Sequence, residues 1–258
     1  MARAKLYYLR GNIWHLTQRC HNREFLLKFS RDRKRWLQWL FEAKKRYGLT
    51  ILNYTVTSNH IHLLVYDDGG KYVIPRSILL VASRTAREYN QRKGRRGAFW
   101  EDHYHATAIE NEEHLHQCMV YIDLNMVRAG VVNHPADWPF TGYNEILSDR
   151  ERYRLIDKLK LQELLGVENE QKLKEIYREQ IEESLSKGNL ERESCWTESV
   201  AVGSMKFIEK IKNELGIRTA HRKIIGTNKL YELRESGKSY TLNFTGKMSG
   251  LRVKILKR

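Results

Sequence analysis

The chain has 258 residues and a formal net charge of +15, with 46 Lys and Arg side chains against 31 Asp and Glu. Hydrophobic residues make up 41% of the sequence, enough for a folded core, so a wholly disordered chain is excluded. No apolar run approaches the roughly 18 residues that a membrane-spanning helix needs, and the charged N-terminus shows no secretory signal. Three widely spaced cysteines form no disulfide framework. These features predict a cytoplasmic protein, without membrane contact, that binds nucleic acid or another anionic surface.

The first 130 residues predict alternating strands and helices. Alternation of apolar and polar residues is typical of half-buried strands, and apolar residues at helical spacing, such as Trp36 and Leu40, are typical of helices. In chain order we expect a strand at 12–20, a helix at 30–48, strands at 49–57 and 61–66, a helix from Pro75, a strand at 99–109 and a helix at 112–129. This order predicts an α+β fold with a ferredoxin-like antiparallel sheet and helices on one face.

The charge changes along the chain and divides it into three parts. Residues 1–150 carry a net charge of +8, residues 151–217 carry −2 and residues 218–258 carry +9. We therefore expect a core domain, a mainly helical connector and a basic C-terminal tail, so that the core is followed by a helical and basic extension. The predicted elements of the extension are one or two helices within 154–187, a helix at 204–215 and a small hairpin within 238–258.

Three His-x-His triplets differ in what they can bind. Residues two apart point to the same side of a strand, but diverge by about 200° around a helix. His60 and His62 begin a strand that we expect to be central: either both bind one metal ion, or one is a core imidazole and the other is exposed. The other triplets are less suited to a metal. They are His103 and His105, expected to face solvent or DNA, and His114 and His116, expected on a helix.

A second group of polar side chains lies on the helix predicted at 112–129. Tyr121 and Asn125 are four residues apart and so share one helical face. Tyr121 offers a phenol and Asn125 a neutral oxygen ligand. Taken alone, the pair also fits a tyrosine at the margin of the core beside an ordinary helical asparagine.

Together the two groups are similar to a known arrangement. The passages TSNHIHLL at 57–64 and YIDLNMVRAG at 121–130 resemble the single-tyrosine HUH transposases, and more closely the REP-associated tyrosine transposases. Further matches at 17–23, 99–100 and 137–143 extend the resemblance over residues 8–147. Many family members have Pro in place of Ser58 and of Met126, and insertion-sequence relatives use Gln in place of Asn125.

The resemblance implies a metal-dependent single-stranded DNA endonuclease and strand transferase that acts at hairpin, palindromic DNA. Tyr121 would be the catalytic nucleophile that forms a 5′-phosphotyrosine, and His60, His62 and Asn125 would bind one Mg²⁺ or Mn²⁺. Residues 1–150 would then be the HUH single-tyrosine transposase domain of a nucleoid-associated protein. Its partner would be single-stranded or hairpin DNA, and the family also allows a homodimer.

Basic residues expected to contact DNA phosphates cluster at the start of the first helix and in the loop after the second helix. The full set is Arg19, Arg31, Arg33, Lys34, Arg35, Arg92, Lys93, Arg95, Arg96, Arg128, Arg222 and Lys223. For the tail from residue 218 onward, we expect that its removal weakens DNA binding more than folding.

Three other interpretations remain open at this stage. One is a catalytically silent hairpin nucleic-acid-binding protein, in which His60, His62 and Tyr121 are structural. Another is a metal hydrolase that adds Asp102 or Asp123 to the histidine pair and forms no covalent DNA adduct. A third is an RNA-processing relative.

Overall fold

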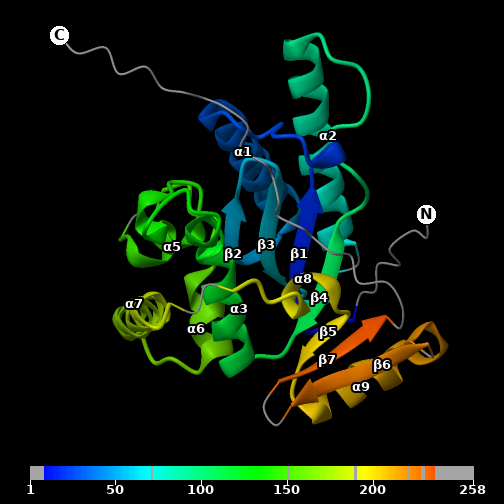
Figure 1. The fold of residues 1–258 in the computed structure, drawn as a ribbon, viewed down its shortest axis with the longest axis vertical. Helices are drawn as coiled ribbons and strands as arrows, with labels where there is room; N and C mark the ends of the chain where they lie inside the picture. Colours follow the sequence, from blue (N-terminus) through cyan, green and yellow to red (C-terminus); the bar gives the residue numbers. More distant parts are fainter. Residues whose placement is uncertain are drawn as a thin grey trace.

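The computed structural model describes residues 9–70, 72–149, 152–188, 191–219, 221–227 and 230–235 as an α+β fold built on one seven-stranded mixed sheet (Figure 1). The strands are β1 (Ile13–Arg19), β2 (Thr50–Val56), β3 (His60–Tyr66), β4 (His105–Ile109), β5 (Ala201–Gly203), β6 (Arg222–Thr227) and β7 (Leu230–Glu235). Their order in the sheet is β2-β3-β1-β4-β5-β7-β6, and every neighbouring pair is antiparallel except β4 and β5. The predicted α+β class is confirmed, and the hairpin expected within 238–258 lies outside the described residues.

The described helices match most of the predicted ones. They are α1 (Ser30–Tyr47), α2 (Val73–Lys93), α3 (Glu113–Asp123), α4 (Asn125–Arg128), α5 (Gly142–Leu147), α6 (Lys158–Leu165), α7 (Glu170–Ser186), α8 (Cys195–Glu198) and α9 (Met205–Leu215). Helix α1 ends at Gly48, whose φ of 71° suits a residue without a Cβ, and α9 begins after Ser204, whose side chain accepts a hydrogen bond from the N–H of Phe207. The helices expected at 154–187 are α6 and α7, separated at Gly166.

Two predicted elements are shorter than expected. The strand predicted at 99–109 begins only at His105, because Trp100 pairs separately with Cys20 and the chain then forms a bend before β4. The helix predicted at 112–129 is divided at Leu124, where ψ is 1°. Hydrogen bonds still continue across the division, from Leu124 N to Val120 O and from Arg128 N to Leu124 O, so α3 and α4 follow one another closely.

The central strands have one apolar and one polar face. On β1, Trp14 and Leu16 are fully buried on one side, and His15 and Thr17 point to the other. Because Thr17 pairs with His62, and His62 pairs with Thr55 of β2, these polar side chains share one face of the sheet. A buried polar face needs a hydrogen-bond partner for each of its groups.

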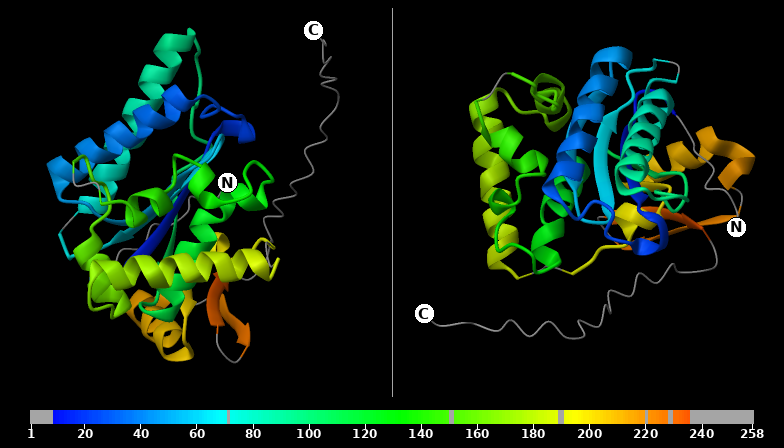
Figure 2. Two further views of the ribbon diagram at one scale, coloured as in Figure 1. Left: turned by 90° about the vertical axis from the view of Figure 1, so that its left-hand side faces the viewer. Right: turned by 90° about the horizontal axis from the view of Figure 1, so that it is seen from above.

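Helices cover both faces of the sheet. Figure 2 shows α1 and α2 side by side on one face and α3 and α7 on the other. The expected placement of the helices on one face is therefore wrong. The reason is that the polar face of the sheet is also buried, and α3 supplies a buried carboxylate, Asp123, that hydrogen-bonds it.

The C-terminal extension continues the sheet of the core. Strand β5 pairs with β4, and β7 pairs with β5. Leu233 on β7 is fully buried, and its carbonyl accepts a hydrogen bond from Val200 N. Part of the chain that was expected to be a basic tail thus forms two strands of the sheet, β6 and β7. That removal of the chain from residue 218 onward weakens DNA binding more than folding stays a prediction. The connector expected to be mainly helical contains α6, α7, α8 and α9 and one strand, β5.

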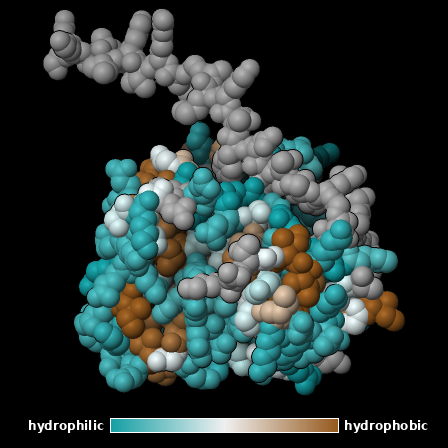
Figure 3. Space-filling view, turned by 60° about the horizontal axis from the view of Figure 1, so that its bottom comes forward, coloured by the Kyte–Doolittle hydropathy of each residue, from teal (hydrophilic) through white to brown (hydrophobic). Residues whose placement is uncertain are grey.

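Surface properties agree with the high net charge. The face in Figure 3 is mostly hydrophilic, with separate apolar patches. Across the described residues, no helix is both long and apolar enough to cross a membrane.

Asp123 ties the second layer of helices to the sheet. Its carboxylate, 1% exposed, accepts hydrogen bonds from Asn53 Nδ2 at 3.1 Å, from Thr55 Oγ1 at 3.3 Å and from the hydroxyls of Thr141 and Tyr177. Burial raises the pKa of Asp123 to about 6, against the opposing effect of these donors. The carboxylate thus joins α3, β2 and α7 at one point.

We expect Tyr177→Phe to lower the free energy of unfolding by about 1–3 kcal/mol, because it removes one donor from a buried carboxylate. Chemical denaturation followed by circular dichroism measures the change. Tyr153→Phe is the matched control, since the Tyr153 side chain is largely exposed. Equal stability of the two variants would contradict the role of Tyr177.

Candidate active site

Two imidazoles lie at the start of β3. His60 and His62 point to the same side of the strand, and their ring centroids are 4.9 Å apart. His62 is 2% exposed, whereas His60 is half-buried. Nδ1 of His60 lies 2.7 Å from Oδ1 of Asn59 and 2.9 Å from Oγ1 of Thr57. Because an amide oxygen only accepts, Nδ1 of the neutral His60 ring carries the proton and Nε2 keeps a lone pair.

A third imidazole, absent from the predicted set, lies beside His62. His15 is fully buried on β1 and stacks on the His62 ring, with centroids 5.1 Å apart and an angle of 18° between the planes. Nε2 of His15 is 2.9 Å from Nδ1 of His62. Nδ1 of His15 is 2.8 Å from the backbone oxygen of Trp196 on α8. Both ring nitrogens of His15 are therefore engaged.

Asn125 hydrogen-bonds both imidazoles of β3, and it contacts the ring nitrogen of His62 that His15 does not. It is the first residue of α4, and its Nδ2 donates to Nε2 of His62 at 2.9 Å. The Asn125 side chain also hydrogen-bonds His60. The structure thus brings together the three residues for which the resemblance implied a metal ion, although they come from β3 and α4.

Tyr121 lies on the last turn of α3, against the same group. Its side chain is 5% exposed, and its ring centroid is 6.0 Å from that of His62 and 6.3 Å from that of His15. The guanidinium carbon of Arg128 lies 4.2 Å from the centroid of the Tyr121 ring. Arg128 also donates a hydrogen bond to the backbone oxygen of Tyr121. The phenol and the imidazoles therefore line one site.

Burial makes the imidazoles neutral. It lowers the pKa of His15 and of His60 to about 3, and the pKa of His62 falls well below its ordinary value of 6.5. Neutral imidazoles are the form that binds metal ions.

The surroundings of Tyr121 shift the pKa of its phenol in opposite directions. Burial raises the pKa of Tyr121, while the charges of Arg128 and Arg192 and a hydrogen bond with Thr197 lower it. Cationic groups near a phenol favour its phenolate, which is the nucleophilic form.

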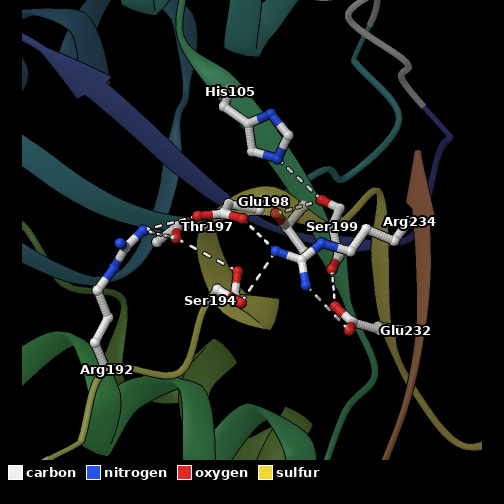
Figure 4. Close-up of polar contacts among 9 residues, drawn as sticks. His105, Arg192, Ser194, Thr197, Glu198, Ser199, Glu232 and Arg234 are labelled. Atoms are coloured by element: carbon white, nitrogen blue, oxygen red, sulfur yellow. Dashed lines mark hydrogen bonds and ion pairs between the residues drawn. The ribbon is translucent and has the colours of Figure 1, made fainter. Parts of the chain in front are cut away.

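The segment containing α8 covers the His15 side of the site. Trp196 is 1% exposed, its ring lies 6.3 Å from that of Tyr121, and α8 packs on β1 and β4. Figure 4 shows the polar contacts that hold this segment. They are Arg192 and Arg234 with Glu198, Arg234 with Ser194, Ser199 with Glu232, and His105 with the backbone oxygen of Ser199. His60, Asn125 and Arg128 remain half-exposed, so the site opens on their side.

The donor set fits a divalent cation. Two imidazole nitrogens and one amide oxygen suit Mn²⁺ or Mg²⁺, with further positions left for phosphate oxygens and water. Across the described residues, no group of three or more His, Cys, Asp or Glu side chains is placed to hold a metal ion. Asp123 is committed to its own hydrogen bonds, and Asp102 is exposed and accepts from His103 N. The arrangement therefore does not support a hydrolase that adds either carboxylate to the histidine pair.

The predicted DNA-binding residues separate into surface and buried groups. Exposed side chains are those of Arg31, Lys34, Arg35, Arg92, Lys93, Arg96 and Lys223, and half-buried ones are those of Arg19, Arg95, Arg128 and Arg222. Arg33 is 7% exposed, and its guanidinium donates to the backbone oxygens of Leu27 and Lys28. It also lies over the rings of Trp138 and Phe140. The prediction that Arg33 contacts DNA is therefore wrong, because its charge is used inside the protein.

A groove lies between α1 and α2. Its volume is about 840 Å³, and Arg31, Lys34, Arg35 and Arg92 are among the residues that line it. Arg35 is paired with Glu88, and Arg92 with the buried Asp32. Within the described part of the chain, Arg31 and Lys34 form no ion pair, so their charges are available to an anionic partner.

Several residues of the site were not predicted. The signal for His15 was a histidine inside a strand, between the apolar Trp14 and Leu16. Arg192 and Thr197 had no local signal, because they reach Tyr121 from a segment more than 70 residues further along the chain.

Comparison with known proteins finds a similar family over the part of the chain that contains this site. Residues 10–125 match the family model described as "Transposase IS200 like". This part of the chain, which contains all four residues of the predicted metal and nucleophile set, is similar to the IS200-like transposases.

Among solved structures, the chain is similar to one described as "Structure of the REP associates tyrosine transposase bound to a REP hairpin". The match has 21% sequence identity and a TM-score of 0.47, and it covers 58% of this chain and 87% of that chain. The bound hairpin is a property of that protein. No curated protein matches the chain.

Proposed function

We propose that this protein is a metal-dependent single-stranded DNA endonuclease and strand transferase that acts at hairpin DNA, with Tyr121 as nucleophile. The observation that supports this most is the meeting of two distant passages in one site. Asn125 Nδ2 lies 2.9 Å from His62 Nε2, and the Tyr121 ring lies 6.0 Å from the His62 ring. Such an arrangement of nucleophile and ligands is what transfer of a phosphodiester requires.

His60, His62 and Asn125 would hold one Mg²⁺ or Mn²⁺, which supplies Lewis-acid polarisation of the scissile phosphate and neutralises charge on the departing oxygen. The lone pair on Nε2 of each imidazole and the oxygen of the Asn125 amide would be the donors.

Tyr121 carries the covalent step. Its phenolic oxygen forms a bond to phosphorus, the bond from phosphorus to the 3′-oxygen breaks, and the phenolic proton passes to solvent or to the departing oxygen. Arg128 and Arg192 stabilise the phenolate as the proton leaves. The product is a 5′-phosphotyrosine and a free 3′-hydroxyl, and attack by another 3′-hydroxyl reverses the step and joins DNA.

The proposed substrate is hairpin DNA with an unpaired flank, as the resemblance to REP-associated tyrosine transposases implies. Residues 1–150 would form the transposase domain on a ferredoxin-like sheet, which the order β2-β3-β1-β4 supports. Residues 151–217 and the basic residues 218–258 would form the extension. A homodimer stays a prediction.

We expect the protein to form a denaturation-resistant adduct with a hairpin-containing single strand labelled 3′ of the cleavage site, in the presence of Mn²⁺ or Mg²⁺. Tyr121→Phe removes one oxygen, so the adduct should disappear while the fold survives. Gel electrophoresis after denaturation measures the adduct, and chelation should abolish it.

Tyr143→Phe is the matched control, because Tyr143 is a buried tyrosine of α5 whose ring packs against His134 and Tyr177. His60→Ala should lose the adduct but retain hairpin binding, since phosphate contacts elsewhere dominate affinity. An adduct that persists in Tyr121→Phe would assign the nucleophile to another residue. Hairpin binding without any adduct would instead favour a catalytically silent binding protein.

The groove between α1 and α2 should bind DNA phosphates. Replacing Arg31 and Lys34 together by Ala should weaken hairpin binding and lower the slope of log K against log salt concentration by about 2, because about one counterion is released per phosphate contact. Fluorescence anisotropy over a salt series measures both. Replacing Arg178 and Lys206, exposed cations of α7 and α9, is the control and should change the slope less. Equal slopes would exclude the groove as a phosphate contact.

A further inference from the structure

A chain of hydrogen bonds runs from the backbone of α8 to the proposed metal site. The carbonyl oxygen of Trp196 only accepts, so Nδ1 of His15, 2.8 Å away, carries the proton. In a neutral imidazole the other nitrogen is then an acceptor, so Nε2 of His15 receives the N–H of His62 Nδ1 across 2.9 Å. His62 therefore has its lone pair on Nε2, the atom that faces Asn125.

We propose that His15 is a positioning residue that fixes His62 in the tautomer able to bind the metal ion through Nε2. The inference rests on the proposed function, because it concerns the same metal site. Without His15, the His62 ring could carry its proton on Nε2, and that nitrogen would no longer be a ligand. Partners of this kind orient ligating imidazoles and raise their basicity.

The proposal gives the C-terminal extension a part in the site. The last acceptor in this series of hydrogen bonds is the backbone oxygen of Trp196 on α8. The contacts of Glu198 with Arg192 and Arg234 hold α8 in place (Figure 4). The stacked rings of His15 and His62 are both buried, so water does not compete for these hydrogen bonds. His15 thereby links the extension to a ligand on β3.

The tautomers can be measured directly in the metal-free wild-type protein. Two-bond ¹H–¹⁵N correlation spectra of the histidine rings distinguish a protonated Nδ1 from a protonated Nε2. We expect His15 and His62 to carry their protons on Nδ1, and His15→Gln identifies the His15 signals. A His62 ring protonated on Nε2 would overturn the proposal.

Metal affinity provides the second test, with Mn²⁺ as the probe and electron paramagnetic resonance of free Mn²⁺ as the readout. His15→Leu removes both hydrogen bonds and should weaken Mn²⁺ binding about 10- to 100-fold. His15→Gln places an amide oxygen where it can accept from His62 Nδ1, and should restore much of the affinity. A merely structural role of His15 would not be rescued in this way.

His105→Leu is the matched control. His105 lies on the neighbouring strand β4 and also contacts a backbone oxygen of the α8 segment, that of Ser199, at 2.9 Å. Its loss should leave Mn²⁺ affinity unchanged, while thermal denaturation reports whether each variant is folded. Equal Mn²⁺ affinity of folded His15→Leu and wild type would overturn the proposal while leaving the proposed metal site intact. Absence of Mn²⁺ binding to the wild type would overturn the metal site itself.

Discussion

The structure depends on a sheet whose central strands bury a polar face. Thr55 and His62 lie next to one another on that face with His15 beside them, and none of them is open to water. Unsatisfied polar groups in such a position cost about 1–3 kcal/mol each, so the layer packed against this face must supply donors and acceptors. Asp123 of α3 and the Trp196 carbonyl of α8 do so. The hydrogen bonds that satisfy the buried polar groups of the sheet thus also hold α3, the helix that carries Tyr121.

The core elements could be predicted because their signals are local. Alternation along β2, the apolar run of β3 and the helical spacing on α1 are set by the faces that these elements bury, and each signal lies within one segment. The division of the last core helix at Leu124 and the late start of β4 were not predictable in this way. Both arise from pairing with other parts of the chain, such as the bridge between Cys20 and Trp100.

The grouping of some residues of the candidate site could be predicted from the sequence, because these residues also lie in local motifs. His60, His62, Tyr121 and Asn125 belong to two compact motifs, and the structure brings their side chains together. His15 has no neighbouring polar residue that would mark it, and its partners become visible only when β1, β3 and α8 are placed side by side. The fold of the extension was the hardest to predict from the sequence. Strand β5 has only three residues, and its pairing with β4 and β7, rather than a long apolar pattern, defines it as a strand.

The net positive charge of the sequence also overstates how many cations are available to an anionic partner. Arg33 is buried against backbone oxygens and two aromatic rings, Arg92 neutralises the buried Asp32, and Arg128 lies over the Tyr121 ring. An arginine can do this because its planar guanidinium stacks on rings and donates several hydrogen bonds at once. Clusters counted along the sequence therefore combine cations that hold the fold, a cation that lies against Tyr121 and cations that are exposed and unpaired among the described residues. Only the structure separates them, and it leaves the exposed pair Arg31 and Lys34 beside a groove whose other cations are already paired.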